Sequence, residues 1–206
     1  MNYLDSTALT PVDLAGYDLG EIVDWTSPVL IKVYEGDKPF TSEQLQNWDE
    51  STHELVGYVL VKDTRPQKPG RKALWKMPAG HRKKESEETG WDFDRTPRDT
   101  AVHETRSETG MRQIPPEAFA YIDKYLHWRK DHWKCVFMAR ITRADLGKMH
   151  GNDPENEGVE PQFFTINEFY DQVYSREVLP EHYQKLVEFG VILSLDAYDA
   201  QQEEAN

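Results

Sequence analysis

The stretches that decide the fold are MPAG at residues 77–80 and TPRDTAVHETRSETGM at residues 96–111. The second stretch has the signals of a helix with two defined ends. Thr96 is suited to cap its N-terminus, and Pro97 stands where a missing backbone N–H costs nothing. Gly110 is expected to end the helix, because a left-handed residue at this point is most easily adopted without a Cβ atom. The first stretch predicts a glycine turn that closes an apolar run.

Two carboxylates share one face of the predicted helix. Glu104 and Glu108 are four residues apart, so their side chains should project in the same direction, and Ser107 belongs to that face as well. Such a pair beside a glycine turn could bind a divalent cation through oxygen ligands. Glutamates at this spacing are also common on solvated helices, so the rest of the chain must decide between the two interpretations.

The composition is that of an acidic chain that can fold. Its 206 residues have a formal net charge of −13, and 38% of them are hydrophobic and 12% aromatic. This charge argues against general binding to nucleic acid or anionic membranes, and no apolar run approaches a membrane span. Cys135 is the only cysteine, which excludes an internal disulfide framework or a thiolate zinc site. Since no secretory signal is apparent either, we expect a cytoplasmic protein.

Positive charge gathers around the glycine turn. Residues 71–84 contain six Lys or Arg residues and His81 but no acid. A charged run often forms only a solvated face, and the alternative is a local anion site that brackets Gly80. The candidate side chains for binding an anion such as phosphate at this place are Arg71, Lys76, Arg82 and Lys83.

Apolar patterns along the chain predict an α+β domain with helices packed on a mixed sheet. Strands are expected at residues 29–34, 55–61, 73–77, 119–128, 133–142 and 162–165. Besides the marked helix, a helical turn is expected near residues 42–48, a helix at 166–174, and a final helix that starts at Leu179-Pro180 and carries apolar residues as far as Leu193. The two long strands flank residues 129–132, which is typical of a hairpin. Residues 81–95 and 147–160 are predicted to be loops.

With these features in place, the sequence resembles the Nudix hydrolase family. The family's box combines a glycine, an early glutamate, an Arg-Glu pair, a second glutamate pair and a closing glycine, and the matching stretch here is residues 80–111. The order of strands, turn, helix, hairpin and final helix is similar to a Nudix domain over residues 28–195. The resemblance implies a Nudix-like α/β/α sandwich with a mixed sheet. The expected organisation is an N-terminal extension at 1–27, the domain at 28–196 and a frayed acidic tail at 197–206.

The box departs from the family's pattern at three places. His103 replaces the arginine that orients the glutamates, and Ser107 replaces one metal-binding glutamate. Gly80 and His103 lie 23 positions apart, which is longer than in the family. The extra residues fall in the charged loop, so the early glutamate has no unique counterpart among Glu85, Glu87 and Glu88.

The resemblance implies a divalent cofactor, Mg²⁺ or Mn²⁺. Glu104 and Glu108 would be catalytic metal ligands, with the carbonyl oxygen of Gly80 as another ligand. The family often adds a glutamate from a downstream loop as ligand or general base. Glu157 is the candidate for that catalytic role and Glu160 is next, while the alternative is that both are solvated loop acids.

The preferred hypothesis is a Mg²⁺-dependent pyrophosphohydrolase that cleaves the diphosphate of a nucleoside diphosphate linked to another moiety. The alternative, favoured by His103 and Ser107, is a catalytically weak or inactive Nudix-fold module that binds a nucleotide as a sensor. A protein-interaction domain is a third hypothesis. A nucleotide-type small molecule is the expected partner, and a homodimer is left open because many relatives dimerise.

Some aromatic and histidine residues are less informative. Tyr34, Trp75, Trp128 and Phe163 could stack on a base, although core packing is the more common role of such residues. His127, His132 and His150 show no metal-ligand spacing with a cysteine or with another histidine, so zinc is not expected.

Overall fold

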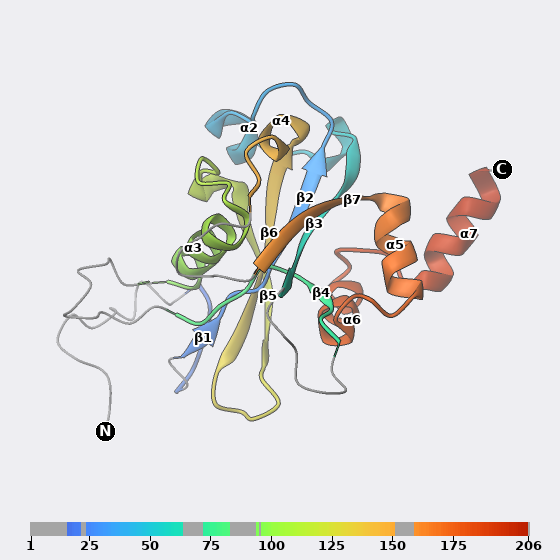
Figure 1. The fold of residues 1–206 in the computed structure, drawn as a ribbon. Helices are drawn as coiled ribbons and strands as arrows, with labels where there is room; N and C mark the ends of the chain where they lie inside the picture. The colour runs from blue at the N-terminus through green and yellow to red at the C-terminus, as the bar shows by residue number, and fades with distance from the viewer. Residues whose placement is uncertain are drawn as a thin grey trace.

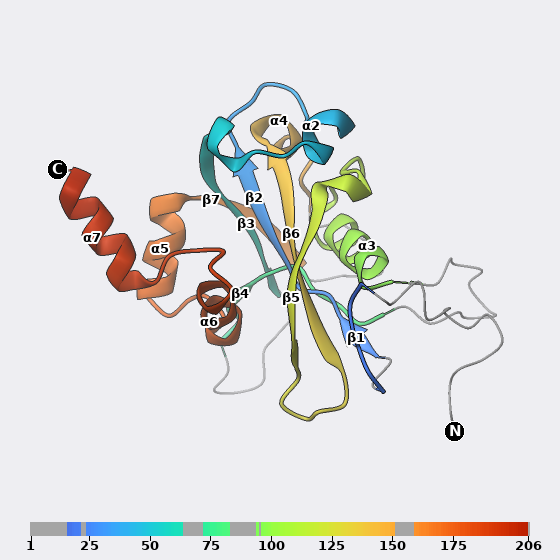
Figure 2. The same ribbon diagram turned by 180° about the vertical axis from the view of Figure 1, so that it is seen from behind.

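A computed structural model describes residues 16–21, 24–63, 72–82, 94, 96–150 and 159–205. A mixed β-sheet forms the centre, with helix α3 (Pro97–Thr109) on one side and helices α5 (Ile166–Tyr174) and α6 (Pro180–Glu188) on the other (Figure 1). The view from behind shows the same layers (Figure 2). The predicted α+β architecture with a mixed sheet is therefore confirmed.

The sheet runs in the order β1-β6-β2-β3-β4, with β5 beside β6 and β7 beside β3. Strand β6 pairs in parallel with β1 and β2, and the other neighbouring strands are antiparallel. The bounds of the strands are β1 Trp25–Thr26, β2 Val29–Tyr34, β3 Leu55–Asp63, β4 Trp75–Lys76, β5 Phe119–Leu126, β6 Trp133–Thr142 and β7 Val159–Thr165.

The remaining helices are shorter or peripheral. They are α2 (Ser42–Gln46), α4 (Arg143–Leu146) and α7 (Leu195–Ala205), with single 3₁₀ turns at Glu50–Thr52 and Pro116–Ala118. No helix in the described parts of the chain has the length and apolar character needed to cross a membrane.

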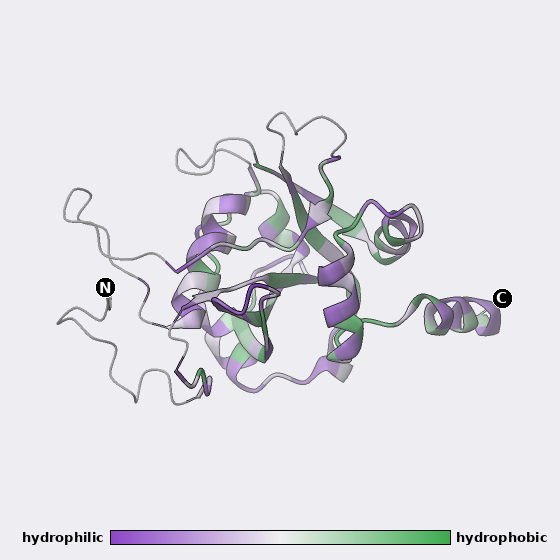
Figure 3. Ribbon diagram, turned by 90° about the horizontal axis from the view of Figure 1, so that it is seen from below, coloured by the Kyte–Doolittle hydropathy of each residue, from purple (hydrophilic) through white to green (hydrophobic). Residues whose placement is uncertain are grey.

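Alternate residues of β2 enter two separate cores, because successive side chains of a strand point to opposite faces. Ile31 is fully buried in the core that includes Val102 of α3. Leu30 is fully buried in the other core, with Phe169 of α5 and Leu186 of α6. The hydropathy colouring in Figure 3 shows hydrophobic residues along the sheet and many hydrophilic ones on the flanking helices. Burial on both faces accounts for the nearly continuous apolar sequence of this strand.

The ends of the domain differ from the expectation. Trp25 and Thr26, placed in the N-terminal extension by the sequence, form β1 and pair with β6. The final predicted helix ends at Glu188, because Gly190 takes a left-handed conformation with φ of 67°. Residues expected to form a frayed tail continue instead as α7, where the ring of Tyr198 stacks on Tyr170 at a centroid distance of 3.8 Å.

Candidate active site

The glycine turn is fixed by backbone hydrogen bonds to the segment that leads into β2. The carbonyl of Gly80 accepts from the N–H of Ser27 at 3.1 Å, and the carbonyl of Pro78 accepts from the N–H of Val29 at 2.9 Å. Just beyond the turn, Arg82 N–H donates to the carbonyl of Trp25 at 3.1 Å. The turn is therefore held at the edge of the sheet, where α3 passes it.

Helix α3 has the predicted ends. Thr96 and Asp99 form a reciprocal capping box, Pro97 is the first helical residue, and Gly110 closes the helix with φ of 74°. Glu104, Ser107 and Glu108 are all buried, with exposed fractions of 6%, 6% and 4%. Carboxylates are rarely buried to this extent unless they are paired or bind a ligand. The interpretation of these glutamates as an ordinary solvated face is thus excluded.

The carboxylate of Glu104 lies against Gly80. A Cβ atom added at this glycine would be 2.2 Å from Cδ of Glu104 and 2.3 and 2.4 Å from its two oxygens. Real Cβ atoms essentially never make contacts this short. A glycine is therefore needed here for the close approach of the carboxylate, and not for an unusual backbone angle.

The carboxylate of Glu108 is held by the turn and by β4. Its Oε2 atom accepts the backbone N–H of Ala79 at 2.9 Å, and its Oε1 atom lies 3.3 Å from Nζ of Lys76. Of the two predicted phosphate-binding residues that the structure describes, Lys76 and Arg82, Lys76 lies beside the glutamates. The turn, α3 and β4 together converge on one buried acidic site beside one lysine.

The other predicted site residues have different positions. The guanidinium of Arg82 lies over the ring of Trp25, 4.7 Å from its centroid, and its Nε donates to the carbonyl of Asp94. Glu160 is exposed on β7, in register with Lys62. The candidates Glu157, Arg71 and Lys83 lie outside the described residues, as do Glu85, Glu87 and Glu88.

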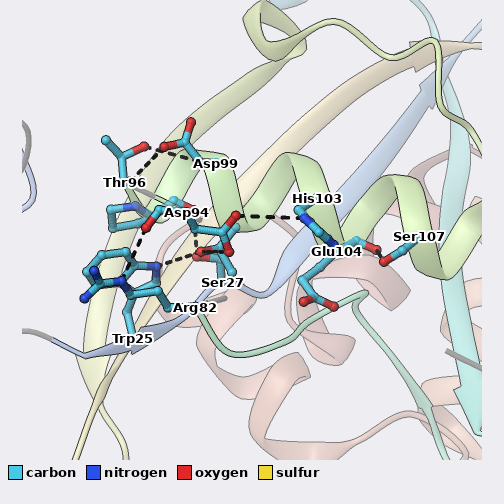
Figure 4. A network of polar contacts seen from close by, with 11 residues as sticks. Trp25, Ser27, Arg82, Asp94, Thr96, Asp99, His103, Glu104 and Ser107 are labelled. Atoms are coloured by element: carbon cyan, nitrogen blue, oxygen red, sulfur yellow. Dashed lines mark hydrogen bonds and ion pairs between the residues drawn. The ribbon is translucent and has the colours of Figure 1, made fainter. Parts of the chain in front are cut away.

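A buried acid that the sequence analysis missed stands before α3. Asp94 is 4% exposed and its Oδ2 accepts from the hydroxyl of Thr100 at 2.9 Å, and that hydroxyl in turn accepts from the indole N–H of Trp25. Its Oδ1 lies 3.9 Å from Nδ1 of His103. Figure 4 shows His103 directed to Asp94, whereas the side chain of Glu104 points away from both. The residue in the place of the family's arginine thus interacts with an acid N-terminal to the helix.

A pocket of about 440 Å³ opens beside the glycine turn. One wall contains Gly80 and Lys76, and another is formed by the tip of the β5–β6 hairpin with His127, Trp128 and His132. Sequence patterns could not reveal it, because its walls come from segments far apart in the chain.

The aromatic residues considered as candidates for base stacking divide by exposure. Tyr34 and Trp75 are 0% and 8% exposed and belong to the core, which is the more ordinary of the two roles considered for them. Trp128 is 73% exposed at the pocket. Among the aromatic residues considered for base stacking, Trp128 is therefore the one best placed to contact a ligand.

A buried histidine, His182, is among the residues that line the pocket. His182 accepts the backbone N–H of Met77 through Nδ1 at 3.1 Å, which requires that this nitrogen carry no proton. Burial lowers the pKa of His182 to about 3. This residue is therefore neutral at physiological pH and connects α6 to Met77, which follows β4 and precedes the glycine turn.

The family model described as NUDIX domain matches residues 48–185, about two thirds of the chain. No curated protein sequence matches the chain. The matched range contains the glycine turn, α3 and the hairpin.

Solved structures with a similar fold include three bacterial proteins. A NUDIX hydrolase from Nitrosomonas europaea has 17% identity and a TM-score of 0.44, covering 82% of this chain and 88% of its own. A mutT/nudix family protein from Listeria innocua has 16% identity and a TM-score of 0.47, covering 90% and 98%. The NUDIX domain of Shewanella oneidensis NrtR, complexed with ADP ribose, has 14% identity and a TM-score of 0.43, covering 81% and 84%. At these scores the family model alone carries the assignment.

Proposed function

This chain belongs to the NUDIX domain family, and on that premise we propose that it is a metal-dependent hydrolase of a nucleoside diphosphate linked to another moiety. The observation that carries the proposal is the burial of two carboxylates, Glu104 and Glu108, directly against the glycine turn. Burying two carboxylates on one face of a helix costs folding free energy unless positive charge compensates them, and a bound cation would provide that charge.

The residues present fit a hard divalent cation. Mg²⁺ prefers oxygen ligands and is commonly held by one or two carboxylates together with water and substrate phosphates. Glu104 and Glu108 would supply those carboxylates. The carbonyl of Gly80 remains a candidate ligand, because it accepts one hydrogen bond from Ser27 and a carbonyl oxygen has a second lone pair. When bound, the cation would neutralise and polarise the diphosphate.

The chain's own groups have separate tasks in this proposal. The backbone N–H of Ala79 fixes the orientation of Glu108. Lys76 forms an ion pair with Glu108 and also lines the pocket. When Glu108 binds the cation, the ammonium group of Lys76 can form an ion pair with a substrate phosphate instead. Glu157 is proposed as the base that accepts a proton from the attacking water. The 440 Å³ pocket would receive the part of the substrate beyond the diphosphate.

A second candidate function is a sensor that binds the nucleotide without cleaving it. The observation in its favour is that Ser107, which replaces a family glutamate, is buried on the same face as Glu104 and Glu108. The site therefore has one carboxylate fewer than the family's pattern. Two carboxylates are nevertheless enough for Mg²⁺ when substrate phosphates complete its coordination, which is why hydrolysis is preferred.

A titration of Mg²⁺ and Mn²⁺ against four substrate classes tests the proposal. ADP-ribose, NADH, dinucleoside polyphosphates and nucleoside triphosphates would each be incubated with the chain, and release of phosphate-bearing products would be measured. We expect metal-dependent turnover of at least one class. Absence of turnover with all four, together with thermal stabilisation by one of them, would instead support the sensor. A cytoplasmic location and a homodimer stay predictions, which fractionation and sedimentation would check.

A further inference from the structure

The tip of the β5–β6 hairpin brings two histidines together. The N–H of His127 donates to the carbonyl of His132 at 3.0 Å, so these residues close the loop formed by residues 128–131. As a cross-strand pair they place their side chains next to each other. The two imidazole rings lie 4.3 Å apart between centroids, with an angle of 23° between their planes.

Both rings turn the same nitrogen towards one carboxylate oxygen. Oδ1 of Asp131 lies 3.1 Å from Nδ1 of His127 and 2.7 Å from Nδ1 of His132. One potential ligand atom from each residue lies within 4.8 Å of the other two. We propose that His127, Asp131 and His132 form a binding site for a late-transition divalent cation, represented by Zn²⁺, which is separate from the carboxylate site on α3.

The distances suit tetrahedral coordination after small side-chain rotations. Zn²⁺ binds imidazole nitrogen and carboxylate oxygen at about 2.0–2.2 Å, which places neighbouring ligand atoms roughly 3.3–3.5 Å apart in a tetrahedron. The two nitrogen–oxygen separations, 3.1 and 2.7 Å, are shorter than this by about 0.2–0.8 Å. A cation would replace the hydrogen bonds that Asp131 now shares with the two rings, and a modest rotation of each ring would bring its lone pair to the ion.

The types of ligand distinguish this site from the one on α3. Imidazole nitrogen favours Zn²⁺, Ni²⁺ or Cu²⁺, whereas Mg²⁺ prefers oxygen ligands alone. His132 is 7% exposed and the side chain of His127 is 14% exposed, so the nitrogen ligands are shielded from bulk water. Asp131, with a side chain 54% exposed, can move to the ion from outside. Within the described residues, this cluster has the composition of a transition-metal site.

The proposed site faces the pocket beside the glycine turn. His127, Asp131 and His132 line the pocket together with Gly80, and the ring of His81 lies 4.9 Å from that of His132. Three protein ligands leave a fourth position of the cation open to water, to His81 or to an anionic group in the pocket. The cation would therefore add positive charge to a pocket that Lys76, Arg129 and Lys134 already line.

The spacing of His127 and His132 in the sequence argues against zinc, because they are not separated as in known zinc motifs. Sequence separation is informative when the ligands lie on one helix or in one zinc-binding loop. The hairpin instead juxtaposes residues by cross-strand pairing, with Asp131 supplied by the turn itself. The proposal rests on this geometry and is independent of whether the chain hydrolyses a nucleotide.

The test is a Zn²⁺ titration of the full chain after treatment with a chelator and its removal. A chromophoric indicator that competes for the metal would report affinity, and Co²⁺ in place of Zn²⁺ would report coordination through its visible absorption. We expect one equivalent of Zn²⁺ to be bound, with the absorption typical of four-coordinate Co²⁺. Either His127→Ala or His132→Ala should weaken binding at least about 100-fold, because loss of a direct ligand exceeds the usual effect of outer-shell changes.

Three further variants distinguish binding at the hairpin from binding elsewhere on the chain. His150→Ala removes an exposed histidine outside the cluster, and the double change Glu104→Gln with Glu108→Gln removes the carboxylate site. Both should retain the Zn²⁺ affinity of the unchanged chain. Asp131→Asn alters an exposed side chain, so it should preserve the fold while lowering the affinity.

Three outcomes would overturn the proposal. The unchanged chain could fail to bind Zn²⁺, or its affinity could be unaffected by both Asp131→Asn and a folded His127→Ala. Loss of binding only when Glu104 and Glu108 are changed would place the ion at the carboxylates instead. Circular dichroism of each metal-free variant would establish that it is folded before its affinity is compared.

Discussion

Replacing Gly80 with alanine should disable the carboxylate site while leaving the chain folded. The backbone at Gly80 is one that alanine adopts without strain, so the effect comes from the added methyl group. That group would lie 2.2 Å from Cδ of Glu104, where ordinary contact begins at about 3.4 Å. The carboxylate must therefore retreat by about 1 Å from the turn.

This displacement predicts a large functional effect and a small structural one. A misplacement of about 1 Å at a catalytic group can reduce activity roughly 100-fold. The neighbour that must move is the end of a flexible side chain, so overpacking should cost no more than about 1–3 kcal/mol in the free energy of unfolding. Folded domains are typically stable by about 5–15 kcal/mol, and Gly80→Ala should remain folded.

The assay has two readouts and a matched control. Mn²⁺ affinity would be measured by electron paramagnetic resonance, and kcat/KM with whichever of the four substrate classes is hydrolysed. Gly147→Ala is the control, because a Cβ atom there meets nothing within 4 Å and its φ is −63°. Retention of both Mn²⁺ affinity and kcat/KM within about threefold in Gly80→Ala would refute the placement of Glu104 against the turn.

Three further changes test other contacts of the site and its surroundings. Lys76→Met leaves the buried Glu108 without its 3.3 Å ion-pair partner, so the metal-free chain should lose about 1 kcal/mol of stability in urea unfolding. Saturating Mn²⁺ should restore this stability. An unchanged urea midpoint would show that the ion pair does not contribute to stability. Ser107→Glu should raise Mn²⁺ affinity and destabilise the metal-free chain through a third buried carboxylate, and unaltered affinity would mean that position 107 does not face the cation. Burial lowers the pKa of His182 from 6.5 to about 3, so between these pH values the unfolded chain binds a proton that the folded chain does not. The contribution of neutral His182 to the free energy of unfolding is therefore complete above pH 6.5 and falls by about 2 kcal/mol at pH 5. His182→Gln should remove this part of the pH dependence in urea unfolding, and an identical slope in both proteins would contradict the neutral, buried state.

The elements with local signals were predictable from the sequence. The ends of α3 followed from Thr96, Pro97 and Gly110, since capping and a left-handed closing residue depend on neighbours within one turn. The β5–β6 hairpin followed from two strand-like apolar runs that flank a polar tetrapeptide, and α5 has the predicted bounds, Ile166–Tyr174. Glu104 and Glu108 could be selected because their spacing of four residues fixes a common helical face.

What escaped prediction depends on contacts between distant segments. The pairing of Asp94 with His103 could not be inferred, because residues 81–95 have no periodicity that reveals burial. Strand β1 has only two residues, too short for a pattern, and exists because Trp25 and Thr26 pair with β6. Helix α7 is largely polar, and the stacking of Tyr198 on Tyr170 that anchors it is a tertiary contact.

The proposed hydrolysis depends on a cation held by Glu104 and Glu108. Its most direct test is metal-dependent turnover by Glu104→Gln, compared with the unchanged chain and with the exposed control Glu117→Gln. Glutamine preserves the shape of the side chain and removes its charge, so folding should persist. We expect Glu104→Gln to lose both Mn²⁺ binding and turnover while Glu117→Gln keeps them. Full metal-dependent turnover by a folded Glu104→Gln would show that Glu104 does not hold the cation.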